Sequence, residues 1–204
     1  MEGILLASSS PRRRELLSSV GIPSEVFSSD VDESLRDSLP PSERVVALAR
    51  DKAAAAVPMA SGQGQRLILA ADTLVCLPTG DAEELALGKP RDRGDAARMI
   101  RLLAGRRHFV RTGVALFDRS TSRMSTTRSD TAVDFAPMSE SEIENYLGSG
   151  EWMGVAGAYR IQGRASLFID SVEGSWSGVV GLPMRELYVI LRDAGYRIPA
   201  FAAL

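Results

Sequence analysis

The sequence predicts an α/β fold, a mixed sheet with flanking helices, for a chain of 204 residues. Apolar runs of strand length and amphipathic segments of helix length interleave from one end to the other. Apolar residues make up 45% and charged residues 25% of the chain, which is typical of a globular protein and excludes disordered and fibrous classes. Neither an internal repeat nor a long linker interrupts the pattern, so we expect a single domain over residues 1–204.

The N-terminal half alternates between strands and helices. Ser10 is expected to be the N-cap of the first helix and Pro11 its first residue, because proline loses nothing by lacking an N–H there. Pro40 and Pro41 break an extended region ahead of the second helix. The expected elements are a strand at 3–7, a helix from 11 to about 20, an extended segment at 24–29, a helix at about 42–56 and a central strand at 67–77.

The C-terminal half is mixed in the same way. Gly105 is expected to stop a helix, and Ser139 with Glu142 has the spacing of a capping box at the start of another. Two alternating segments predict an antiparallel hairpin. The expected elements are a helix at 92–103, strands at 108–118 and 128–135, a helix from 139 that includes Leu147, and a last helix at about 183–194.

Charge and cysteine content exclude several classes of protein. The formal net charge of −2 provides no overall attraction to nucleic acid or to an anionic membrane. Cys76 is the sole cysteine, so a disulfide framework or a thiolate zinc cluster is excluded. The N-terminal segment lacks the order of a signal peptide, and no apolar run approaches the ~20 residues of a membrane span. We therefore expect a soluble, cytoplasmic protein.

The segment ASSSPRRREL, residues 7–16, places a serine-rich turn between a strand and a helix start. Hydroxyls, free backbone N–H groups and the helix dipole converge there, and Arg12, Arg13 and Arg14 can reach the same point, which suits a phosphate. The segment is not a GxxxxGK[ST] phosphate loop, and a capped helix with a solvated basic turn is the alternative. Arginines oppose the dipole there by about 0.3 to 1 kcal/mol each when exposed, which favours a ligand.

Asp72 is the single acid in the apolar run 67–77. A carboxylate inside a hydrophobic strand costs several kcal/mol unless it is paired or ligated. We therefore expect Asp72 to face a cleft, a cation or a metal. Both a structural ion pair and a functional acid fit this pattern, since perturbed acids in clefts are enriched at functional sites.

Several other polar residues indicate a function only when they are considered together. Lys52 on an alanine-rich helix and Lys89 in the turn LGKP are each typical of surface lysines when taken alone. Asp32 and Glu33 form an ordinary acidic loop pair, although carboxylates on loops are what Mg²⁺ or Mn²⁺ needs beside substrate phosphates. Gln162 offers amide donors and an acceptor, which suits the imide edge of uracil or thymine but is a weak signal by itself.

His108 is the only histidine, so neither a Ser-His-Asp triad nor a two-histidine metal site can be assembled. Its place at the opening of a predicted strand favours a structural role.

Six segments taken in order resemble the signature blocks of the Maf family: LLASSSPRRRELL, ALARDKA, LAADTLV, LGKPRD, AGAYRIQG and VVGLPM. Each block is weak alone, but the ordered set is highly specific and spans nearly the whole chain. The resemblance implies a nucleotide pyrophosphatase with an α/β fold related to inosine triphosphate pyrophosphatases, in which two lobes flank a deep cleft. It also implies hydrolysis between the alpha and beta phosphates.

The resemblance also implies roles for individual residues. Asp72 is expected to be the catalytic acidic residue, as a proton acceptor or through a divalent metal, Mg²⁺ or Mn²⁺, which Glu33 also binds. The positions that separate pyrimidine-specific members from those acting on 7-methyl-GTP all match the dTTP/UTP pattern, and these are Arg12, Thr73 and Gln162. The expected phosphate contacts are Ser8, Arg13, Lys52 and Lys89.

One departure from the family pattern concerns a cation. Many members have a lysine just before AGAY, where this chain has Val155, so one cationic contact is missing or is supplied elsewhere, by Arg160 or Arg164.

We therefore expect an enzyme that hydrolyses dTTP and UTP, or modified pyrimidine nucleotides, in a housecleaning role, and the pattern leaves a homodimer open. The alternatives are a 7-methyl-GTP pyrophosphatase, a septum-formation inhibitor that acts in cell division by binding alone, and a nucleic-acid-binding module, which the charge and the 6% aromatic content disfavour.

Overall fold

The computed structural model describes residues 3–27, 31–60, 62, 64–80 and 83–198. Its strands are β1 Ile4–Ala7, β2 Ser24–Phe27, β3 Leu67–Pro78, β4 Glu84–Leu87, β5 Arg107–Asp118, β6 Arg123–Phe135 and β7 Ile169–Glu173. Its α-helices are α1 Pro11–Ser19, α2 Pro41–Met59, α3 Arg93–Leu103, α4 Glu140–Gly148, α5 Trp176–Val180 and α6 Met184–Asp193. Three 3₁₀ turns are η1 Glu33–Arg36, η2 Ala156–Ala158 and η3 Arg164–Phe168.

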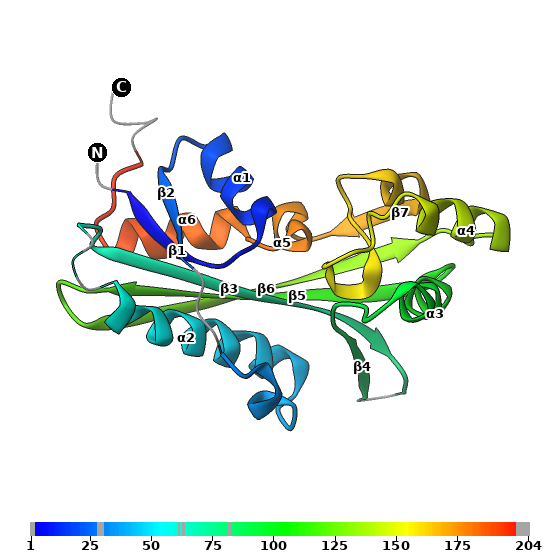
Figure 1. The fold of residues 1–204 in the computed structure, drawn as a ribbon, viewed down its shortest axis with the longest axis horizontal. Helices are drawn as coiled ribbons and strands as arrows, with labels where there is room; N and C mark the ends of the chain where they lie inside the picture. The colour runs from blue at the N-terminus through cyan, green and yellow to red at the C-terminus, as the bar shows by residue number, and fades with distance from the viewer. Residues whose placement is uncertain (1–2, 28–30, 61, 63, 81–82, 199–204) are drawn as a thin grey trace.

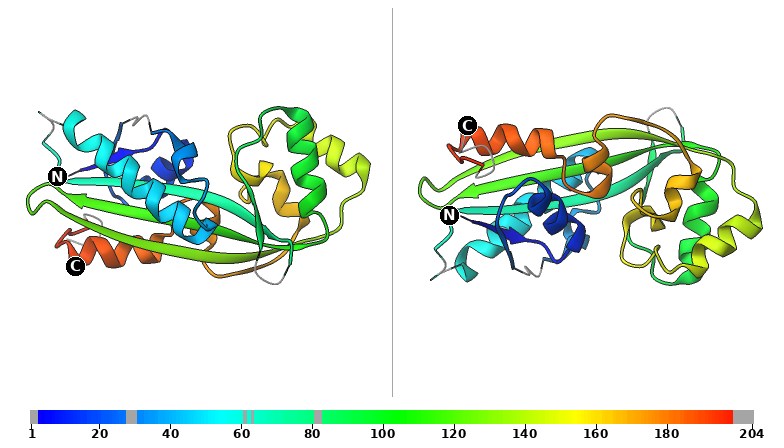
Figure 2. Two further views of the ribbon diagram at one scale, coloured as in Figure 1. Left: turned by 90° about the horizontal axis from the view of Figure 1, so that it is seen from below. Right: turned by 90° about the horizontal axis from the view of Figure 1, so that it is seen from above.

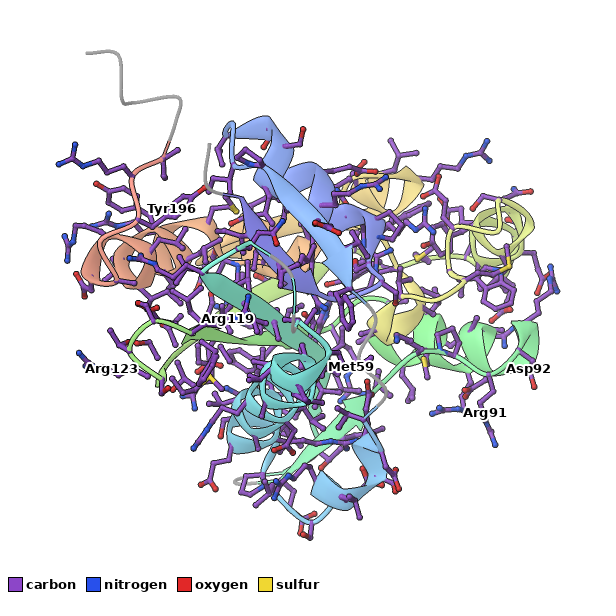
Figure 3. The ribbon with its side chains drawn as sticks, turned by 60° about the vertical axis from the view of Figure 1, so that its left-hand side comes forward. Met59, Arg91, Asp92, Arg119, Arg123 and Tyr196 are labelled. Atoms are coloured by element: carbon purple, nitrogen blue, oxygen red, sulfur yellow. The ribbon has the colours of Figure 1, made fainter. Side chains whose placement is uncertain are left out.

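All strands join one seven-stranded mixed sheet in the order β2-β1-β3-β5-β6-β7, with β4 beside β3. The expected α/β class is therefore confirmed. Helix α2 covers one face of the sheet, and α1, α5 and α6 cover the other (Figure 1). Helices α3 and α4 lie together at one end of the long hairpin β5–β6 (Figure 2). Figure 3 shows the two ends of the molecule, with Arg119 and Arg123 at the hairpin turn and Arg91 and Asp92 at the start of α3.

Each predicted helix and strand is present, with small differences in its bounds. Helix α2 runs to Met59, beyond the predicted end, with Pro58 inside its last turn. Strands β4 and β7 and helix α5 were not predicted. They have four or five residues each, and their stability comes from pairing and packing with distant segments rather than from a local pattern. Of the predicted extended segment at 24–29, the last two residues lie outside the described part of the chain.

Caps begin the helices much as predicted. Ser139 and Glu142 form the complete capping box at α4, and Asp92 caps α3 through the backbone N–H of Asp95. Ser10 is the N-cap residue of α1 and Pro11 its first residue, as predicted, although the Ser10 side chain makes no capping hydrogen bond. The first-turn N–H groups of α1 therefore lack this partner.

The central strand β3 is split along one of its edges. Near its start it pairs with β1 in parallel, from Leu67 to Leu69, and near its end with β4 in antiparallel fashion, from Val75 to Pro78. Residues 70–74 have no ladder partner on this edge within the described chain, while β5 pairs along the other edge. Because β1 and β4 both run toward this gap, the segments that follow them, Ser8 onward and Gly88 onward, flank it.

Alternation along β3 sends neighbouring side chains to opposite faces. Ile68 and Ala70 pack in the cluster beneath α2, whereas Leu69 and Ala71 pack in the cluster under α1 and α6. The two central polar residues follow this alternation, so Asp72 faces the α2 side and Thr73 the other side. A Cβ on Gly113, which pairs with Asp72, would lie 2.6 Å from the backbone nitrogen of Val46, so α2 packs this closely only because residue 113 is glycine.

His108 belongs to the core at the α3–α4 end. Its ring is fully buried, and Nε2 lies 2.9 Å from the Tyr159 hydroxyl. Burial lowers the pKa of His108 from 6.5 to about 4, so the ring is neutral at physiological pH. These contacts support the expected structural role.

No helix in the described part of the chain is long and apolar enough to cross a membrane.

Candidate active site

A cleft of about 620 Å³ opens at the split in the sheet. It is lined by segments distant in sequence: the β1–α1 turn, η1, α2, the middle of β3, the segment after β4 and the loop after η2. Every candidate residue lines it, namely Ser8, Arg12, Arg13, Glu33, Lys52, Asp72, Thr73, Lys89 and Gln162.

Two neighbours of these residues do not line the cleft. Arg14 is exposed, so the expectation that all three arginines reach one point holds for Arg12 and Arg13 alone. Asp32 instead caps η1 by accepting a hydrogen bond from the backbone N–H of Ser34.

Asp72 is paired with a lysine from α2. Lys52 Nζ lies 2.6 Å from Asp72 Oδ1 and 2.7 Å from Glu33 Oε1, and the side chains of Lys52 and Asp72 are only 14% and 9% exposed. Burial raises the pKa of Glu33, but the hydrogen bond and charge of Lys52, with the charges of Lys89 and Arg44, outweigh it and hold the pKa below its ordinary value. Asp72 was expected to face a cleft, a cation or a metal, and it faces both the cleft and the Lys52 cation.

Arg13 joins three segments on the opposite face of β3. Its Nε donates to the carbonyl of Gly181 at 2.8 Å, Nη1 to Ser8 Oγ at 2.8 Å and Nη2 to Thr73 Oγ1 at 3.2 Å. Burial lowers the pKa of Arg13, and the charge of Asp72 raises it in part. The guanidinium is thus held in place by neutral oxygens rather than by a carboxylate, which leaves its charge available to an anion in the cleft.

Thr112 supports this arrangement and was not identified from the sequence. Its hydroxyl is fully buried in β5, donates to the carbonyl of Gly178 at 2.8 Å and lies 3.0 Å from Thr73 Oγ1. Thr112 therefore holds the Thr73 side chain in place through this hydroxyl contact. Its neighbours in sequence are Arg111 and Gly113, so no local pattern indicates it, and its role depends on the pairing of β5 with β3.

Lys89 is exposed and stands in an irregular segment between Gly88 and Pro90. The carbonyl of Gly88 accepts a hydrogen bond from the N–H of Gly157 at 3.0 Å, which ties this segment to η2. Gly157 adopts φ of 66°, and a Cβ there would lie 2.7 Å from a methyl group of Val75. Glycine is therefore required for η2 to approach β3 and close this side of the cleft.

The two arginines proposed as substitutes for the missing lysine lie in different places. Val155 is buried in the cleft wall, and Arg160 also lines the cleft. Arg164 is exposed and lies outside the cleft lining, and its backbone N–H donates to Glu151 Oε2 at 2.8 Å. Of the two, Arg160 alone is available to a ligand in the cleft.

The carboxylates suit a metal shared with a substrate. Glu33 and Asp72 converge on the same Lys52 nitrogen, so two hard oxygen donors meet at one point of the cleft. The described residues contain no group of three or more His, Cys, Asp or Glu able to hold a metal alone. Mg²⁺ usually binds through one or two carboxylates together with substrate phosphates and water, so this pair fits such an ion.

The fold and the cleft together define a mixed α/β protein with a cationic cleft at a split in its central sheet. The profile of the family described as Maf-like protein matches residues 3–194. The chain therefore belongs to the Maf family.

Curated relatives cover the chain almost completely. A protein of Pelotomaculum thermopropionicum named dTTP/UTP pyrophosphatase is 43% identical over 198 residues, 97% of this chain and 100% of its own length. Proteins of the same name from Treponema denticola and Chromobacterium violaceum are 42% and 44% identical, over 97% and 96% of this chain and 100% and 96% of their own lengths.

Proposed function

We propose that this protein hydrolyses dTTP and UTP to the monophosphate and pyrophosphate. One observation carries the proposal: a buried acid, Asp72, lies in a cleft whose other charged groups are mostly cations without a carboxylate partner among the described residues. The names of its relatives support the same activity. We place the reaction in the cytoplasm with a free nucleotide, rather than a nucleic acid, as the ligand, in line with the net charge of −2.

Phosphoryl chemistry depends mainly on positioning and charge neutralisation. In our proposal Arg13, Lys89 and the first-turn N–H groups of α1 bind the triphosphate, and Ser8 contributes through the hydrogen bond that orients Arg13. Lys52 contacts Asp72 through Oδ1, so the second carboxylate oxygen can orient the water that attacks the alpha phosphorus. A divalent metal held by Glu33 and Asp72 would supply further charge neutralisation when bound.

Base selection is assigned to Gln162, whereas Arg12 and Thr73 occupy the other two positions of the pyrimidine-specific pattern and Arg12 is left to the phosphates. The Gln162 side chain is exposed at the cleft, where its amide can pair with the alternating acceptor, donor and acceptor groups of uracil or thymine. Cytosine inverts two of these three positions. A site that forms such hydrogen bonds leaves its own polar groups unpaired with the wrong base, at about 1 to 3 kcal/mol for each group that the bound nucleotide covers. We therefore expect UTP and dTTP to be preferred over CTP by ~10-fold or more.

The test is kcat/KM for UTP, dTTP, CTP and 7-methyl-GTP. The change Gln162→Ala should reduce the preference for UTP over CTP more than it reduces the rate on UTP, because the phosphate contacts still position the reacting centre. Gln65→Ala is the matched control, since Gln65 lies outside the cleft lining and donates to Glu25. A wild-type preference for 7-methyl-GTP, or unchanged ratios in Gln162→Ala, would refute the assignment.

A further inference from the structure

Arg160 lines the cleft together with Arg12, and it is the arginine available to supply the cationic contact that Val155 lacks. The buried Nε of Arg160 has no hydrogen-bond partner among the described residues, although buried polar groups normally have one. Burial lowers the pKa of Arg12, and the positive charge of Arg160 lowers it further. Both side chains line the same cleft, Arg12 from the first turn of α1 and Arg160 from the loop after η2.

Neither guanidinium forms an ion pair within the described part of the chain. The acids of the cleft lie elsewhere, because Asp72 and Glu33 both contact Lys52. Like charges brought together in a half-buried site repel one another, and an anion between them removes that repulsion. The backbone at Arg160 is also fixed, since the residues on either side of it, Tyr159 and Ile161, are both buried.

We propose that Arg12 and Arg160 form a clamp for the terminal phosphates of the nucleotide, which leave as pyrophosphate. This clamp rests on the proposed function. Arg13 contacts Thr73, the residue after Asp72, whereas Arg12 lines the cleft together with Arg160, so we place the clamp beyond Arg13 from the acid. An alpha phosphate placed at Asp72 then directs the rest of the chain of phosphates past Arg13 toward the clamp. A fork of guanidinium N–H groups matches phosphate oxygens in geometry as well as in charge.

The test is binding of the two products separately, by calorimetry at one fixed Mg²⁺ concentration. Arg160→Gln should weaken the binding of inorganic pyrophosphate by at least about tenfold, the expected loss for a hydrogen bond between charged groups, and should change UMP binding less than about twofold. Arg160→Lys should recover part of the loss, since it restores the charge but not the fork. Arg164→Gln is the matched control, because Arg164 lies outside the cleft lining, and it should leave both affinities unchanged.

The outcomes separate this proposal from the proposed function. Weaker pyrophosphate binding in Arg160→Gln supports the clamp even if UTP is not hydrolysed. If Arg160→Gln weakens UMP binding and leaves pyrophosphate binding intact, Arg160 contacts the nucleoside and the clamp is wrong. Equal losses in Arg160→Gln and Arg164→Gln would also overturn it, since they would show an effect of net charge alone.

Discussion

Replacing Lys52 by methionine should destabilise the protein strongly, because it leaves a buried carboxylate without its partner. Lys52 Nζ contacts Asp72 and Glu33 at 2.6 Å and 2.7 Å, and the Asp72 side chain is only 9% exposed. Removing one partner of a buried ion pair costs about 3 to 5 kcal/mol. Glu33 is 46% exposed and can be solvated, so most of this loss arises at Asp72.

A double-mutant cycle measures this interaction. Urea unfolding followed by circular dichroism should show a loss of about 3 kcal/mol or more in Lys52→Met, with most of it recovered in Lys52→Met/Asp72→Asn, where both buried charges are absent. Arg36→Gln breaks an ion pair whose side chains are 41% and 32% exposed, and it should lose far less. If Lys52→Met loses no more than Arg36→Gln, the buried pair does not hold the acid in place and the reasoning fails.

Three further predictions follow from the same structure. Asp72→Asn should lower UTP turnover by at least ~100-fold with an unchanged circular dichroism spectrum, and near-normal turnover would leave Asp72 with a structural role alone. Gly113→Ala should force α2 outward and cost about 1 to 3 kcal/mol, lowering Tm by about 2 to 4 °C per kcal/mol, whereas Gly148→Ala, with open space around its Cβ, should not; equal melting temperatures would contradict this. Because burial lowers the pKa of His108 from 6.5 to about 4, the unfolded chain binds its proton first as the pH falls, so stability is full above pH 6.5 and is lost toward pH 4. Urea unfolding should show about 2 kcal/mol of additional loss between pH 7.5 and 5 in the wild type relative to His108→Gln, and parallel losses in both proteins would refute this.

Much of the fold could be predicted from local patterns. Caps and periodicity identified the long helices and the central strands, because a helix such as α4 carries its own start signal in Ser139 and Glu142. Strand β4 carries no such signal, since ELAL has only four residues and is held in place by pairing with the end of β3. Helix α5 contains Gly178 and two valines, which are poor helix formers, and its place is set by contacts with β5 and β6.

The site was predicted residue by residue but not as an arrangement. Asp72 is recognisable locally as an acid in an apolar strand. Its partner Lys52 lies in α2, and the pair can be identified only once it is known which face of the sheet Asp72 points to. The cleft itself exists because β1 and β4 pair with the same edge of β3 and leave a gap, which is a long-range property. The choice between Arg160 and Arg164 likewise depends on tertiary structure.

The central claim is that water attacks the alpha phosphorus of a nucleotide held in this cleft. Hydrolysis of UTP in ¹⁸O-labelled water, followed by mass spectrometry of the products, tests it most directly. We expect UMP and pyrophosphate in equal amounts, with the label in UMP and none in pyrophosphate. Label in pyrophosphate, or release of UDP and orthophosphate, would contradict the account.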